Sequence, residues 1–375
     1  MLVNSHRTAL FSAALAATAA AVFAAAPAAL ASSGAPFVKQ FNKISTIGST
    51  VPRNGDLNPY GVVVVQQSQG RLARGDVLIS NFNNAKNLQG TGTTIVQVSP
   101  GGQRHLFAHI SAAGLPGACP GGVGLTTALT ILRGGWVVVG SLPTTNGMAA
   151  TAKAGCLIVL DNTGRVRETI FGHGINGPWD LTAAQTGSGA DLFVSNVLNG
   201  TVAANGRTVH RGQVLRLTLK LDGSTPPQLV ATTKIGSGFA EHSDPSALVV
   251  GPTGLGLSGQ GTLYVADSAS NRITAIPGAL TRTGSAGTGM AVTKGGALST
   301  PLGLTVAPNG DVLTVNAGNG KLVETTPSGR QVAIRVLDRS GTPPGSGALF
   351  GLALAPGNRG IYYVDDAANT LRLLH

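Results

Sequence analysis

Short runs of apolar and β-branched residues recur along the chain and alternate with turns rich in Gly, Asn and Asp. The clearest unit has one apolar run at Asp244–Val250 and a second at Gly261–Ser268, followed by Asn271–Ile273. Two later units repeat this order, with second runs at Asn309–Asn316 and Gly360–Asp366. Apolar runs of this length between turn residues are typical of β-strands. We therefore expect an all-β protein built from repeated units.

Each second run ends at a polar residue that marks its unit. These landmark residues are Asn81, Ser141, Asn196, Asp267, Asn316 and Asp365, and the last two intervals between them are both 49 residues. A period near fifty built from short strands is typical of a β-propeller, in which every blade is a four-stranded sheet. Six landmarks predict six blades.

The outer strands of the blades are more polar than the inner ones. Gln103–Ile110, Arg165–Phe171 and Gln331–Leu337 are predicted fourth strands, and Val214–Leu219 is a predicted third strand. The sixth unit contains only three predicted strands. Phe37–Thr46 precedes the first unit and has the pattern of an outer strand, so we expect it to complete the sixth blade. This pairing would close the ring and remove the exposed sheet edges.

The segment Val265–Ile273 resembles the strand–turn–strand signature of the NHL-repeat family of six-bladed propellers, within the wider streptogramin-lyase and SMP-30-like superfamily. The resemblance extends from about Asn58 to Leu374. It implies a six-bladed propeller, and among distant relatives it implies lactonase, esterase or lyase activity. Because propellers support unrelated chemistries, it favours the fold more than any one activity.

The first residues have the pattern of an export signal. His6 and Arg7 precede an apolar, Ala-rich stretch at Ala9–Ala26, and Ala29–Ala31 offers small residues for cleavage. We expect a signal peptide at residues 1–31 and a propeller at residues 32–375. The alternative is a retained membrane anchor, but the stretch is short. Later apolar runs are too short to span a bilayer, so we expect no transmembrane anchor after cleavage. The signal pattern predicts an exported protein of the periplasm or medium.

Composition narrows the classes of function. Charged residues make up 11% of the chain and apolar residues 42%, which excludes a disordered chain and a coiled coil. The formal net charge is +11, but the basic residues are scattered singly along the chain. We therefore expect no nucleic-acid partner. The expected form is a monomer that binds a small molecule or a protein.

Cys119 and Cys156 are the two cysteines of the chain. In an oxidising compartment such a pair can form a disulfide, which we predict here. Two unpaired thiols are the alternative.

Long connections are predicted on one face of the ring, where strand four leads to strand one and strand two leads to strand three. Their Gly, Ala, Thr and Asn content suits ligand binding, so this loop-rich face is the predicted functional face. The long connections are Phe82–Thr94, Ser111–Thr126, Leu142–Gly155, Val197–Gly212, Lys234–Asp244 and Asp338–Ala348.

One position near the propeller axis carries an unexpected charge. The aligned residues of the first strands are Gly61, Ala128, Asp180, Ala247, Gly303 and Gly351. A carboxylate in such a crowded place needs a partner or a cation. Asp180 could join the landmark oxygens in a Ca²⁺ site, in a ring with Asn81, Asn196, Asp267, Asn316 and Asp365. The alternatives are turn capping by the landmark residues and a structural pairing of Asp180.

Histidines supply a second set of candidates on the loop-rich face. His173 and His242 are predicted acid/base residues, with Glu241 or Asp244 beside them. Together with His210 they could instead bind Zn²⁺, although no close ligand spacing supports a zinc site. Solvated loop histidines are the third possibility.

Familiar catalytic motifs are absent from the sequence. It contains neither a Gly-x-Ser-x-Gly nucleophile elbow nor a phosphate-binding Gly-rich motif, so nucleotide cofactors are not expected. We predict an exported propeller that binds a ligand through its loop-rich face. The alternative is a Ca²⁺- or Zn²⁺-assisted hydrolase or lyase of the lactonase or amidating-lyase type.

Overall fold

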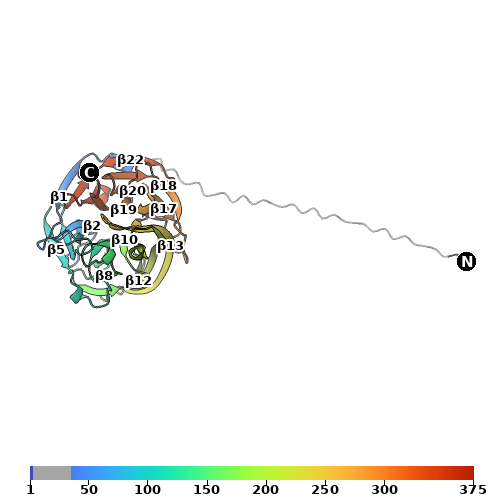
Figure 1. Ribbon diagram of the computed structural model, residues 1–375, viewed down its shortest axis with the longest axis horizontal. Coiled ribbons are helices and arrows are strands. Elements are labelled where there is room, and N and C mark those ends of the chain that lie inside the picture. The colour runs from blue at the N-terminus through green and yellow to red at the C-terminus, as the bar shows by residue number, and fades with distance from the viewer. Residues whose placement is uncertain (3–34) are drawn as a thin grey trace. The chain divides into compact units, whose positions relative to one another are not determined.

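A computed structural model describes residues 1–2 and 35–375. The predicted signal peptide at residues 1–31 therefore lies, apart from its first two residues, outside the described part. Six antiparallel sheets surround a central axis (Figure 1). In the described ranges, no helix has the length and apolar character needed to cross a membrane.

The sheets follow one another in chain order, one for each repeat. Blade 1 contains β2 (Leu57–Val64), β3 (Val77–Asn83), β4 (Thr94–Val98) and β5 (Arg104–His109). Blade 2 contains β6 (Leu125–Leu132), β7 (Trp136–Ser141), β8 (Cys156–Leu160) and β9 (Val166–Ile170). Blade 3 contains β10 (Pro178–Gln185), β11 (Gly189–Asn196), β12 (Val209–Lys220), β13 (Gln228–Asp244) and β14 (Leu248–Val250).

The second half of the ring continues this order. Blade 4 contains β15 (Pro252–Leu257), β16 (Leu263–Asp267), β17 (Arg272–Ile276) and β18 (Met290–Lys294). Blade 5 contains β19 (Pro301–Val306), β20 (Val312–Asn316), β21 (Lys321–Thr325) and β22 (Gln331–Val336). Blade 6 contains β23 (Leu349–Leu354), β24 (Ile361–Asp365), β25 (Thr370–Leu374) and β1 (Ile44–Ser49). The short helices are η1 (Phe37–Gln40), η2 (Ala112–Gly114), η3 (Ala149–Thr151), α1 (Thr201–Ala204), η4 (Ser268–Ser270) and η5 (Pro356–Asn358).

The N-terminal strand closes the ring, as predicted. β1 pairs antiparallel with β25, with Ile44 opposite Leu374. The strand begins later than expected, because Phe37–Gln40 forms the helix η1. The backbone N–H groups of Phe37 and Val38 donate hydrogen bonds to the buried Glu324 carboxylate, at 2.6 and 2.8 Å. This contact holds the segment that leads into the closing strand.

The first strand of blade 4 is not where the sequence predicts it. Leu248–Val250 forms β14, which pairs with the end of β13 as a fifth strand of blade 3. The Asp244 carboxylate accepts backbone hydrogen bonds from Ser246 and Ala247, at 2.7 and 3.0 Å, and so stabilises the turn between β13 and β14. The true first strand, β15, begins at Pro252, and its axial residue is Gly254 rather than Ala247.

Small residues near the axis let neighbouring blades meet backbone to backbone. A Cβ atom on Gly303 would lie 2.0 Å from the carbonyl oxygen of Phe350, and one on Gly351 would lie 2.1 Å from that of Tyr60. A Cβ atom on Gly254 would lie 2.1 Å from the carbonyl oxygen of Leu302. These distances explain why the position carries Gly or Ala in the other five blades. Asp180 remains the exception.

An aromatic cluster fills the axis where the first strands begin. The Tyr60 ring stacks on Phe82 and Phe350, with centroids 4.5 and 4.1 Å apart, and Trp179 lies 5.7 Å away. All four side chains are buried in one hydrophobic cluster. We call these four residues the aromatic plug.

Candidate functional site

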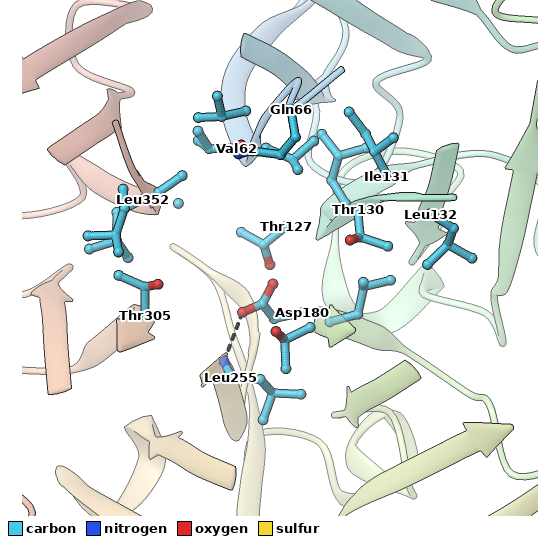
Figure 2. A pocket seen from close by; sticks show the side chains of 18 of the residues that line it. Val62, Gln66, Thr127, Thr130, Ile131, Leu132, Asp180, Leu255, Thr305 and Leu352 are labelled. Atoms are coloured by element: carbon cyan, nitrogen blue, oxygen red, sulfur yellow. Dashed lines mark hydrogen bonds between the residues drawn. The ribbon is translucent and has the colours of Figure 1, made fainter. Parts of the chain in front are cut away.

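A cavity of about 660 Å³ lies beyond the aromatic plug, between the first strands of the blades (Figure 2). Its size falls within the range of small-molecule sites. One aliphatic side chain from each blade faces it. These six residues, the aliphatic ring, follow the axial position directly and are Val62, Leu129, Leu181, Leu255, Leu304 and Leu352.

Asp180 places a carboxyl group in this cavity, beside the aliphatic ring. Its Oδ2 atom accepts a hydrogen bond of 2.9 Å from the backbone N–H of Leu255, on the first strand of the neighbouring blade (Figure 2). None of the ion pairs among the described residues involves Asp180. Desolvation by burial raises the pKa of Asp180 to about 7, although the Leu255 and Leu181 N–H groups oppose the shift. A carboxyl group with a pKa in this range can take up or release a proton near neutral pH.

Polar groups increase toward the open end of the cavity. Thr130, Thr182 and Thr305 line its walls beyond the aliphatic ring. The residues at the mouth, called the rim here, are Gln66, Gln67, Gln69, Arg133 and Gln185. Asp180 and Arg133 are the two charged residues among those lining the cavity. The site thus combines a deep acid, an apolar middle and a polar, basic entrance.

The cavity opens on the face opposite the predicted functional face. Its rim comes from connections between first and second strands, whereas the aromatic plug fills the axis toward the loop-rich face. The long loops of the sequence indicated the other face. A signal was available in the unusually long connection Val65–Asp76 of blade 1, which contains three of the four rim glutamines.

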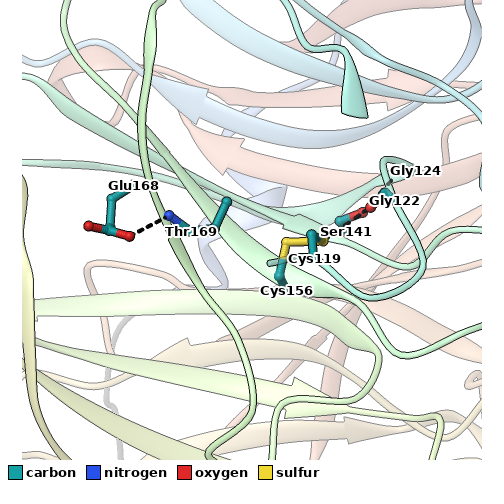
Figure 3. The surroundings of a disulfide bond; sticks show 7 residues. All are labelled: Cys119, Gly122, Gly124, Ser141, Cys156, Glu168 and Thr169. Atoms are coloured by element: carbon teal, nitrogen blue, oxygen red, sulfur yellow. Dashed lines mark hydrogen bonds between the residues drawn. A yellow bond between two sulfur atoms is a disulfide. The ribbon is translucent and has the colours of Figure 1, made fainter. Parts of the chain in front are cut away.

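The loop-rich face carries the disulfide, as predicted. Cys119 and Cys156 are bonded, with their Cα atoms 5.2 Å apart (Figure 3). Ser141 holds the same loop, because its hydroxyl donates to the Gly122 carbonyl at 2.9 Å and accepts from the Gly124 N–H at 3.0 Å. Disulfides persist in oxidising compartments, so this bond agrees with export.

The strand-end residues of the predicted calcium set lie apart from the cavity lining. Asp267 pairs with Arg272 at 2.7 Å, and Asp365 pairs with Arg372 at 3.1 Å. The three amides make hydrogen bonds with neighbouring loops: Asn81 donates to the Thr50 carbonyl, Asn316 donates to the Ala297 carbonyl, and Asn196 accepts from the Asn176 N–H. These contacts are those of strand-end residues that hold local turns.

The predicted histidines also lie outside the cavity lining. His173 is exposed in a turn with φ of 52°, and His210 is exposed on β12. His242 is partly buried on β13, and its Nδ1 atom is buried without a hydrogen-bond partner. Their acid/base and zinc roles stay predictions. Across the described ranges, no three His, Cys, Asp or Glu side chains form a group that could hold a metal ion.

Comparison with known proteins supports the architecture. No family model matches the chain, and no curated protein matches its sequence. Among solved structures, a gluconolactonase from Xanthomonas campestris is 14% identical, with 88% of each chain covered and a TM-score of 0.53. Regucalcin, a calcium-binding protein from Agrobacterium tumefaciens, is 13% identical over 88% of this chain and 93% of its own, with a TM-score of 0.55.

A streptogramin B lyase is 14% identical over 89% of this chain and 97% of its own, with a TM-score of 0.50. The chain shares their propeller fold. At such low identity the likeness establishes architecture alone, so chemistry must be argued from the residues of this propeller.

Regucalcin is a calcium-binding protein, which raises the question whether the cavity of this propeller can hold Ca²⁺. Ca²⁺ takes six to eight oxygen ligands and usually several carboxylates. Asp180 is the single acidic residue among those lining the cavity. The carboxylates of Asp267 and Asp365 are already paired with arginines. The cavity residues therefore do not fit a calcium site, and we derive no step through a metal ion.

Proposed function

We propose that this propeller is an enzyme of the hydrolase or lyase type that binds a small, partly apolar molecule in its central cavity. Asp180 would act as the general acid/base. The observation that carries the proposal is a carboxyl group without a cationic partner, among the described residues, facing a ligand-sized cavity that is ringed by aliphatic side chains. The names gluconolactonase and streptogramin B lyase among the fold neighbours support this reaction class.

A single carboxyl group of near-neutral pKa suits both reactions, because a general acid/base works best when its pKa is close to the working pH. In hydrolysis of an ester or lactone, Asp180 would accept a proton from water as the water oxygen bonds to the acyl carbon. The proton would then pass to the leaving oxygen as the acyl C–O bond breaks. In an elimination, Asp180 would accept a proton from carbon, the C–H electrons would form the new double bond, and the leaving oxygen would depart with the C–O electrons.

Activity assays with Asp180→Asn test this role. We expect the wild-type protein to hydrolyse members of a panel of nitrophenyl esters and lactones, and the variant to lose at least about 100-fold in kcat, because it cannot exchange a proton. KM should change little, since Asn is similar in size and retains an oxygen for the Leu255 N–H. The measurement is steady-state kinetics at pH 7.

Asp222→Asn is the matched control, because Asp222 lies on the surface in an exposed pair with Lys220. It should leave kcat unchanged. Turnover by Asp180→Asn at the wild-type rate would show that the carboxyl group is not the acid/base.

Binding through the loop-rich face is the second proposal. It is supported by the long loops of that face, which the Cys119–Cys156 disulfide links. A partner captured by the intact protein and lost in the Cys119→Ala/Cys156→Ala variant, but retained by Asp180→Asn, would favour this second role.

A further inference from the structure

We infer that the substrate is an anionic amphiphile whose negative group binds Arg133 at the cavity mouth while its apolar body reaches toward Asp180. This inference rests on the proposed function, because it names the substrate class of the same cavity. The juxtaposition that carries it is a hydrogen-bonded guanidinium at the entrance of a cavity that is ringed by aliphatic side chains and whose one acid lies at the far end.

Contacts with blade 3 hold Arg133 in place at the mouth. Its Nη2 donates to the Thr186 carbonyl at 2.8 Å, and its backbone N–H donates to the Gln185 side chain at 3.0 Å. Gly134 and Gly135 follow with φ of 84° and 73°, so a tight turn presents the arginine at the end of β6. A guanidinium held in this way has lost part of its conformational freedom before a ligand binds.

Arg133 has no acidic partner among the described residues. The ion pairs of the described residues do not include it, and Asp180 is the one acid in the cavity lining. Arg133 is also exposed at the rim, so an approaching ligand can reach its donors. Such a group favours carboxylate, sulfonate or phosphate, which accept charge-assisted hydrogen bonds from arginine. The net charge of +11 also attracts anions toward the surface.

The depth of the cavity defines the rest of the ligand. Arg133 lies five residues beyond Ala128, the blade 2 residue at the level of Asp180. At about 3.3 Å per residue this separation is about 17 Å along the strand. The aliphatic ring and the threonines lie between the two levels. A ligand with an anionic end at Arg133 would therefore place apolar atoms against the aliphatic ring, and its charge would stay remote from Asp180.

Two fluorescent probes of similar apolar body test the inference. Anilinonaphthalene sulfonate carries an anion, and N-phenylnaphthylamine is neutral. We expect both to bind the wild-type protein with one-to-one stoichiometry. Arg133→Gln should weaken binding of the sulfonate about tenfold, because one charge-assisted contact is lost, and should change binding of the neutral probe less than about twofold.

Arg165→Gln is the matched control, since Arg165 is exposed in the turn before β9 and is not among the residues lining the cavity. It removes the same charge and should leave both affinities unchanged. Thr182→Trp narrows the cavity and should weaken the binding of both probes. This result would show that the probes bind in the cavity. Retained binding of the neutral probe by Arg133→Gln shows that this variant is folded.

The inference is overturned if Arg133→Gln and Arg165→Gln weaken the sulfonate equally, if both probes lose affinity equally in Arg133→Gln, or if neither probe binds the wild-type protein. It can fail separately from the proposed reaction. Loss of turnover in Asp180→Asn without an effect of Arg133 on sulfonate binding would leave the reaction supported and this substrate class rejected. Weaker sulfonate binding by Arg133→Gln together with unchanged turnover by Asp180→Asn would reject the proposed reaction and leave this substrate class supported.

Discussion

Asp180→Asn should be more stable than the wild-type protein at pH 8, by up to about 4 kcal/mol, although it removes a carboxylate that accepts a hydrogen bond. Burial raises the pKa of Asp180 from 3.8 to about 7 in the folded state. Each pKa unit of difference between folded and unfolded states corresponds to about 1.4 kcal/mol. Ionising this carboxyl group inside the cavity therefore costs the folded protein stability, and the neutral amide avoids that cost.

The pH dependence follows from the two pKa values. Below pH 3.8 the carboxyl group is protonated in both states and contributes no difference. Between pH 3.8 and about 7 it ionises in the unfolded chain but stays protonated in the folded one, so stability falls as pH rises. Above pH 7 the carboxyl group is ionised in both states, and the loss of stability is complete. The advantage of Asp180→Asn should grow through this window and then level off.

Urea unfolding of both proteins at pH 4 and pH 8 measures this difference. Burial also raises the pKa of Glu241 and Asp366 to about 7 and that of Asp365 to about 6, so the wild-type protein should lose further stability over the same range. Comparison with Asp180→Asn cancels those contributions. Equal stabilities of the two proteins at pH 8 would mean that Asp180 is solvated or paired.

Removal of the disulfide is expected to lower the free energy of unfolding by about as much as Asp180→Asn raises it. The bond joins residues separated by 37 positions, and in the chain-entropy model closing such a loop in the unfolded state stabilises the fold by about 4 kcal/mol. The Cys119→Ala/Cys156→Ala variant should unfold at correspondingly lower urea concentration. Because the bond lies on the loop-rich face, beyond the aromatic plug, we expect affinity for N-phenylnaphthylamine to remain unchanged.

Urea unfolding of the double variant and of the reduced wild-type protein measures the stability, and fluorescence titration in the absence of urea measures the binding. Ser141→Ala is a useful companion, since it removes two hydrogen bonds from the same loop without touching the disulfide. A double variant of wild-type stability would refute the stabilising role. A large loss of probe affinity would show that the two faces are coupled.

The sequence was sufficient to predict the propeller because each blade repeats the same local pattern. Apolar, β-branched runs end at Asn, Asp or Ser, and strands such as β16 and β20 end at the predicted residues, Asp267 and Asn316. Closure by the N-terminal segment followed from the missing fourth strand of the last blade. The fifth strand of blade 3 was not predictable in this way, because Leu248–Val250 has the composition of an inner strand and only its pairing partner distinguishes it.

The candidate site was only partly predictable. Asp180 was recognisable because it breaks a row of small axial residues, and that exception proved to lie in the cavity. Its surroundings depend on which side of the aromatic plug is open, which no local pattern reveals. Arg133 resembled any other isolated arginine, because its importance depends on contacts with Gln185 and Thr186 of the next blade.

The central claim is that Asp180 is a partly buried carboxyl group facing a ligand cavity, and a carbon-13 NMR titration of its carboxyl carbon tests this most directly. The signal can be identified by its absence from Asp180→Asn. We predict a midpoint near pH 7 that moves upward when N-phenylnaphthylamine fills the cavity, because an apolar ligand removes water from the ionised form. A midpoint near pH 4 that does not respond to the probe would contradict the account.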